Sequence, residues 1–199
     1  MPRKPREMAL GEYYHVLSRG NNKQTLFHEA GDYEYYLRAL GHYRLKYGVS
    51  IFHYCLMTNH VHLLLRSDQK SEGITKMMHG LQMVYAFYFK RRRDATGHVF
   101  EDRFRHILID SEAYLLECGR YIERNPLRAR MVRGPGDYRW SSYSFYAFGK
   151  ADEIVTSDPL YETLGLAKED RQKSYREYVE PPRPYEIILD RYFEERVLV

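Results

Sequence analysis

The chain has 199 residues and a net charge of +4, and its length and apolar content fit one globular domain with a further segment. No run approaches the roughly 20 apolar residues that a membrane-spanning helix needs, so we expect none. The charge is unevenly distributed: residues 1–150 hold 24 Lys and Arg against 15 Asp and Glu, and residues 151–199 hold 7 against 12. A body of +9 beside a segment of −5 indicates an anionic polymer as the partner of the body.

Two cysteines, Cys55 and Cys118, lie in apolar stretches without the spacing of a metal finger or a disulfide framework. We interpret both as small buried residues. Residues 1–7 are basic, and no apolar stretch of a secretory signal follows them. These features predict a cytoplasmic protein.

Hydrophobic periodicity predicts the elements of the chain in order. A first strand is expected over residues 13–21 and a helix over residues 32–47, which ends at Gly48. Residues 50–57 and 60–66 alternate as the two strands of a hairpin. A long helix over residues 71–93 follows, and then a loop and a last strand within residues 98–110.

Ser111 is expected to cap another helix, which Asn125 and Pro126 should stop because the residue before a proline avoids the helical region. Beyond it the pattern weakens. We expect a loop or short helix over residues 137–143, helices within residues 158–166 and 169–179, an extended linker over 180–184, and a short helix or strand over 185–199.

The order strand, helix, strand, strand, helix, strand predicts an α+β protein of the ferredoxin-like βαββαβ plan, with an antiparallel sheet and its helices on one face. We assign residues 1–149 to this domain and residues 150–199 to an acidic C-terminal extension.

Two histidines one residue apart, His60 and His62, stand on the second strand of the hairpin. Strand side chains alternate, so both imidazoles point to one face while Val61, Leu63 and Leu65 point into a core on the other. Such a strand is a plausible platform for a divalent metal.

Tyr121 and Asn125 are four residues apart on the predicted helix after Ser111 and therefore share a face. A tyrosine hydroxyl can attack phosphorus and form a phosphotyrosine ester with DNA. Because it is a weak nucleophile, it needs a metal that polarises the phosphate. His60, His62 and the Asn125 amide oxygen could hold that metal between strand and helix.

Five ordered blocks carry a family resemblance: residues 14–21, 57–64, 96–104, 121–129 and 138–143. Over residues 10–148 the chain resembles the single-tyrosine HUH transposases, and most closely the branch associated with repetitive extragenic palindromic (REP) elements in bacteria. The resemblance implies a ferredoxin-like domain that cuts and joins single-stranded DNA beside a hairpin through a 5′-phosphotyrosine intermediate.

The resemblance also implies roles for individual residues. Tyr121 would be the nucleophile, and His60 and His62 would bind Mg²⁺ or Mn²⁺. Asn125 stands where the family places a polar metal-site residue, which is glutamine in its best-known branch.

The basic clusters are expected to contact the backbone of a DNA hairpin. They comprise Lys90, Arg91, Arg92, Arg93, Arg103 and Arg105. The resemblance further implies a bacterial, nucleoid-associated protein, and it favours a monomer over a dimer that exchanges tyrosine helices.

Four other functions share parts of this pattern. A ferredoxin-like single-strand nucleic-acid binding module would have no use for Tyr121. A plasmid relaxase or replication initiator shares the metal-and-tyrosine chemistry but usually has a longer chain. A cupin-type hydrolase needs Glu and Gly spacing that does not follow the His pair, and an amidohydrolase barrel needs about 250 residues.

Overall fold

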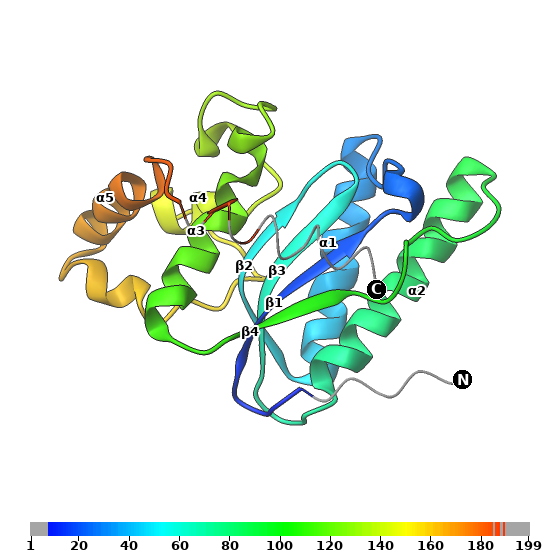
Figure 1. The fold of residues 1–199 in the computed structure, drawn as a ribbon, viewed down its shortest axis with the longest axis horizontal. Coiled ribbons are helices and arrows are strands. Elements are labelled where there is room, and N and C mark those ends of the chain that lie inside the picture. The colour runs from blue at the N-terminus through cyan, green and yellow to red at the C-terminus, as the bar shows by residue number, and fades with distance from the viewer. Residues whose placement is uncertain (1–7, 185, 188, 190–199) are drawn as a thin grey trace.

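A computed structural model of the chain describes residues 8–184, 186, 187 and 189, with the side chains of residues 112 and 113 left aside. Its centre is an antiparallel sheet of four strands in the order β2-β3-β1-β4 (Figure 1). The βαββαβ unit consists of β1 (Tyr13–Arg19), α1 (Ala30–Tyr47), β2 (Val49–Leu56), β3 (His60–Ser67), α2 (Gly73–Arg93) and β4 (Arg105–Ile109). This confirms the predicted ferredoxin-like plan.

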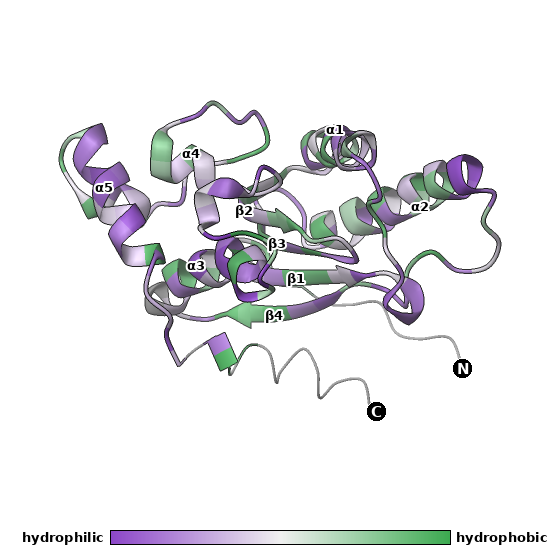
Figure 2. Ribbon diagram, turned by 90° about the horizontal axis from the view of Figure 1, so that it is seen from above, coloured by the Kyte–Doolittle hydropathy of each residue, from purple (hydrophilic) through white to green (hydrophobic). Residues whose placement is uncertain are grey.

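The helices α1 and α2 pack together on one face of the sheet (Figures 1 and 2). Val61, Leu63 and Leu65 of β3 are fully buried in this core, as predicted from their alternation. On α2 the buried residues are Ile74, Met77, Met78, Leu81, Tyr85 and Phe89, which recur at helical spacing. The periodicity of the sequence therefore determined this layer.

The ends of α1 follow from its sequence. Glu29 and Asp32 form a capping box at its start, and Gly48 ends it with a left-handed φ of 62°. That conformation favours glycine, and here a Cβ would also lie 2.5 Å from the side chain of Gln69.

A third helix, α3 (Glu112–Arg128), covers the opposite face of the sheet. Cys118, Tyr121 and Ile122 of α3 pack against a second core that includes Phe52 and Leu64. The sequence predicted helices on one face of the sheet. That holds for α1 and α2 of the βαββαβ unit, but α3 also covers the other face. Cys55 and Cys118 are buried free cysteines, as predicted.

The helix α3 does not stop before Pro126, as the sequence predicted, but continues to Arg128. Proline lacks the N–H that would otherwise bond to the carbonyl of Ile122. Here the side-chain amide nitrogen of Asn125 donates to the carbonyls of Tyr121, at 2.9 Å, and Ile122, at 3.3 Å. The asparagine thus supplies the donor that the proline lacks, and the helix extends past it.

Residues after α3 return to β2, which is an outer strand of the sheet, and pair with its free edge. Backbone bonds run from Leu56 to Trp140 and from Thr156 to Ile51, so two segments cover an edge that would otherwise be open. The helices here are α4 (Tyr143–Phe148) and the mostly hydrophilic α5 (Lys168–Val179; Figure 2).

The helix expected within residues 158–166 is shorter than predicted, a 3-10 turn η3 (Tyr161–Leu164). Two further 3-10 turns are η1 (Asn21–Lys23) and η2 (Pro135–Asp137). Most of the element predicted over residues 185–199 lies outside the described residues. Within the described residues, no helix is both long and apolar enough to cross a membrane.

Candidate active site

The two histidines of β3 lie on the face of the sheet that α3 covers. Their ring centroids are 4.9 Å apart. His62 is 3% exposed, and His60 is half-buried at the start of the strand. The predicted sharing of one face is therefore observed.

The hydrogen bonding of His60 determines its tautomer. Nδ1 lies 2.7 Å from Oδ1 of Asn59, whose amide nitrogen in turn donates to the carbonyl of Lys23. An amide oxygen only accepts, so Nδ1 of His60 carries the hydrogen and Nε2 offers a lone pair. Burial, with a smaller effect of Arg19, lowers the pKa of His60 to about 4. The ring is therefore neutral near physiological pH, which is the form that binds metals.

His62 is hydrogen-bonded to a histidine of the neighbouring strand. Its Nδ1 lies 2.9 Å from Nε2 of His15, which is fully buried on β1. Burial lowers the pKa of His62 well below its ordinary value and lowers that of His15 to about 3. Two neutral imidazoles therefore share one hydrogen bond beneath α3.

Tyr121 of α3 reaches this pair of rings. Its ring centroid is 5.6 Å from that of His62 and 5.6 Å from that of His15, both edge to face. The guanidinium carbon of Arg128 lies 5.1 Å from the Tyr121 ring centroid. The structure thus brings together the three residues that the sequence singled out, His60, His62 and Tyr121, although strand and helix are far apart in the chain.

Asn125 lies one turn after Tyr121 and is buried. Its amide nitrogen is occupied by the carbonyls of Tyr121 and Ile122, so the oxygen is the atom with which it can bind a metal. In the described part of the chain, no group of three or more His, Cys, Asp and Glu could hold a metal ion. Further ligands to a metal on the two imidazoles would thus be of another kind.

The sequence match agrees with this geometry. A sequence model of the family described as "Transposase IS200 like" matches residues 10–125, more than half of the chain. The chain belongs to the IS200-like transposases. The matched region contains His60, His62, Tyr121 and Asn125, and membership of this family implies a transposase that cleaves DNA.

One solved structure supports the fold of this transposase, and a second match is weaker. A REP-associated tyrosine transposase bound to a REP hairpin is similar with a TM-score of 0.58 and 15% identity, over 79% of this chain and 93% of that chain. A protein of Deinococcus radiodurans R1 described as a transposase has a TM-score of 0.42 and 17% identity, over 62% of this chain and 97% of that chain. No curated protein sequence gives a significant match.

The basic residues of the transposase divide into two groups. Arg93 pairs with Asp32 at 2.7 Å and Arg92 with Glu29 at 2.5 Å, which ties the end of α2 to the start of α1. Arg105 pairs with Glu101 at 3.3 Å. Lys90 and Arg91 are exposed and form the second group, while Arg103 is exposed but also has contacts of its own. The sequence could not identify the partners of Arg92 and Arg93, because Glu29 and Asp32 are distant from them in the chain.

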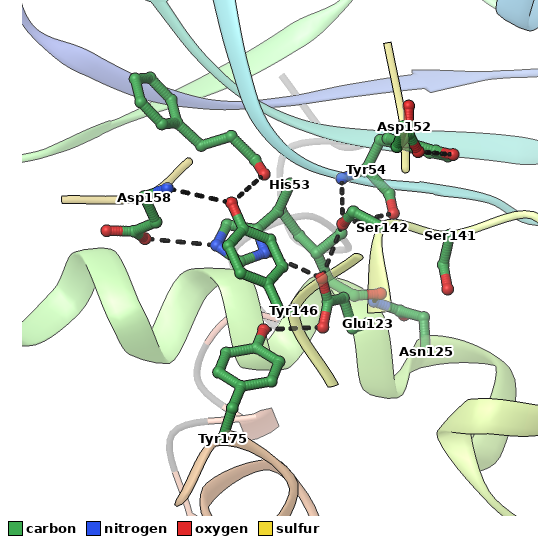
Figure 3. Close-up of polar contacts among 12 residues, drawn as sticks. His53, Tyr54, Glu123, Asn125, Ser141, Ser142, Tyr146, Asp152, Asp158 and Tyr175 are labelled. Carbon is green, nitrogen blue, oxygen red and sulfur yellow. Dashed lines mark hydrogen bonds and ion pairs between the residues drawn. The ribbon is translucent and has the colours of Figure 1, made fainter. Parts of the chain in front are cut away.

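A buried ionic cluster that the sequence did not predict surrounds Glu123 of α3, two residues after Tyr121 (Figure 3). His53 of β2 contacts Glu123 of α3 at 2.9 Å and Asp158 at 3.2 Å. Glu123 also accepts from Ser142 at 2.6 Å and from Tyr175 of α5 at 2.7 Å. The cluster therefore joins α3 to the sheet and to α5.

His53 is charged within this cluster. Burial alone would lower its pKa, but hydrogen bonds to Asp158 and Glu123 outweigh burial and raise the pKa to about 9. A buried cation between two carboxylates meets the condition under which a buried charge is tolerated.

The stability of the transposase should fall as the pH rises from 6.5 to about 9. The pKa of His53 is 6.5 in the unfolded chain and about 9 in the folded one. The protonated His53 therefore stabilises the folded state fully below pH 6.5, and this stabilisation is lost as the pH rises to about 9. This difference corresponds to roughly 3 kcal/mol. Urea unfolding across the range measures it. Asp158→Asn should weaken the dependence, and an unchanged slope in that variant would contradict this origin.

A methyl group at Gly119 of α3 should disturb the cluster. A Cβ there would lie 2.5 Å from Nε2 of His53, whose ring is held on both sides. Gly119→Ala should lower the free energy of unfolding by about 1–3 kcal/mol, despite the better helix propensity of alanine. The control is Gly31→Ala in α1, where a Cβ meets nothing within 4 Å and stability should rise slightly. Equal gains in both variants would argue against the close packing.

Proposed function

We propose that this transposase cuts and rejoins single-stranded DNA beside a hairpin, with Tyr121 as nucleophile and a divalent metal on His60 and His62. The observation that carries the proposal is the contact of the Tyr121 ring with the ring of His62, at 5.6 Å between centroids. A tyrosine that served only to fill the core would be expected to pack against apolar side chains, whereas Tyr121 packs against the imidazoles of His15 and His62. In this proposal residues 1–149 form the catalytic domain, and residues 150–199 form an extension that completes the buried cluster of His53.

The reaction is a transesterification. The Tyr121 oxygen forms a bond to phosphorus while the bond to the 3′ oxygen breaks, which leaves a 3′ hydroxyl and a 5′-phosphotyrosine. The phenol loses its proton and the leaving oxygen gains one. A second 3′ hydroxyl reverses the step and seals the strand, so no nucleotide cofactor is needed. Arg128 places positive charge beside the ring that has to become an anion.

Mg²⁺ or Mn²⁺ is the ion expected at this site. His60 and His62 would bind it through Nε2, because their Nδ1 atoms face Asn59 and His15. Asn125 would add its amide oxygen, and water or phosphate oxygens would complete the shell. When bound, the ion polarises the phosphate and stabilises negative charge in the transition state.

The DNA partner would be a single strand with a hairpin, the ligand of the REP-associated neighbour. Exposed Lys90 and Arg91 are the cations that suit its phosphates best, because Arg92, Arg93 and Arg105 already pair with carboxylates. We infer a monomer, since Glu123 anchors α3 to His53 of its own sheet.

Covalent capture of DNA tests the nucleophile. A hairpin oligonucleotide labelled at its 3′ end and incubated with Mn²⁺ should yield a labelled protein band on a denaturing gel. Tyr121→Phe should abolish the band while hairpin binding persists. Tyr43→Phe, at a half-buried tyrosine of α1, is the matched control and should retain it.

The outcomes separate the alternatives. An adduct that survives in Tyr121→Phe overturns the assignment of the nucleophile. A wild-type protein that binds the hairpin and never forms an adduct is instead a nucleic-acid binding module without chemistry.

Hairpin binding tests the division of the basic residues. Removing Lys90 and Arg91 by alanine substitution should weaken binding and reduce the slope of log Kd against log salt by about 0.7 for each lost phosphate contact. Arg92→Ala, which breaks the pair with Glu29, should chiefly lower stability, and only slightly, because the pair is exposed to solvent. Titrations at several salt concentrations and urea unfolding measure the two effects. A salt slope unchanged in the first variant would exclude both residues from the interface.

A further inference from the structure

A third histidine, His15, belongs to the candidate site, although the resemblance gave it no role. His15 is fully buried in the middle of β1, on the same face of the sheet as His62. Its ring touches both partners of the proposed chemistry, with centroids 5.1 Å from His62 and 5.6 Å from Tyr121. An apolar residue would fill this position at a lower cost of desolvation than an imidazole.

The contact between His15 and His62 constrains where one hydrogen lies. The two rings meet through Nε2 of His15 and Nδ1 of His62, at 2.9 Å. A neutral imidazole has one N–H and one lone pair. If the hydrogen of His62 were on Nε2, that nitrogen could not bind a metal. A metal-competent His62 therefore donates from Nδ1 to His15.

We propose that His15 is a positioning residue, which accepts a hydrogen bond from Nδ1 of His62 and thereby presents Nε2 of His62 to the metal. The inference rests on the proposed function, because the metal belongs to that function. The hydrogen bonding of His60 supports the proposal, because His60 donates from Nδ1 to Asn59 in the same manner. Each imidazole of the pair thus has its own acceptor, the arrangement that orients histidine ligands in metal sites.

Three variants test the role of His15. His15→Leu keeps the bulk and removes the acceptor. His15→Gln offers an amide oxygen near the position of Nε2. Leu64→Ala is the control for lost packing, because Leu64 is the register partner of His15 and is fully buried in the same core.

Two measurements without DNA are needed. Nitrogen–proton correlation spectra of the metal-free protein report the tautomer of His62, and electron paramagnetic resonance of free Mn²⁺ reports the affinity. We expect His15→Leu to lose the single Nδ1–H tautomer and to bind Mn²⁺ about 10- to 100-fold more weakly. His15→Gln should restore both, and Leu64→Ala should lower stability with no effect on either.

The proposal is overturned if His15→Leu keeps the tautomer of His62 and the affinity, or if Leu64→Ala weakens Mn²⁺ binding as much. His62→Ala distinguishes this failure from failure of the proposed function. If it binds Mn²⁺ as tightly as wild type, the metal site itself is wrong, and the tautomer of His62 in His15→Leu still decides whether His15 orients that ring.

Discussion

The alternation of side chains along β3 is the constraint on which the rest of the structure depends. Val61, Leu63 and Leu65 are buried against α1 and α2, so the residues between them must face α3. A slip of one residue would exchange the two faces, and the apolar packing prevents it. Because the sheet is covered on both sides, the imidazoles stand in a poorly solvated layer that keeps them neutral.

The position of Tyr121 depends on a second constraint, the anchoring of α3. Glu123 lies two residues further along the helix and is held by His53, Ser142 and Tyr175. A buried ion pair gains little net free energy, because desolvation opposes the attraction, but losing one partner costs about 3–5 kcal/mol. The cluster therefore holds α3 in one position on the sheet. Asp158 and Tyr175 follow α3 in the chain by more than 25 residues, so the C-terminal part of the chain helps to hold α3 in place.

Structural contacts occupy part of the binding capacity of several polar residues of the transposase. The amide nitrogen of Asn125 carries α3 past Pro126, which leaves its oxygen as the atom for a metal. Arg92 and Arg93 join α2 to α1 at the end of a basic run whose first members are exposed. In both places the residue type alone indicates a metal ligand or a charge for phosphate. How much of that binding capacity is available depends on the structural partners of the residue.

The sequence by itself determined the order of elements, the faces of β3 and α2, and the selection of His60, His62 and Tyr121, because hydrophobic periodicity and short motifs are local properties. It misjudged the end of α3 because the local preference of proline was overridden by the Asn125 side chain. The sequence assigned no role to His15 and Glu123, although both stand in blocks of the family resemblance, and it gave no signal for His53 and Asp158. The role of a buried histidine or carboxylate becomes visible only when its partner is known. Only the tertiary structure brings β1 beside β3 and Asp158 beside His53, and hydrogen bonds between residues so distant in the chain exist only once the sheet has formed.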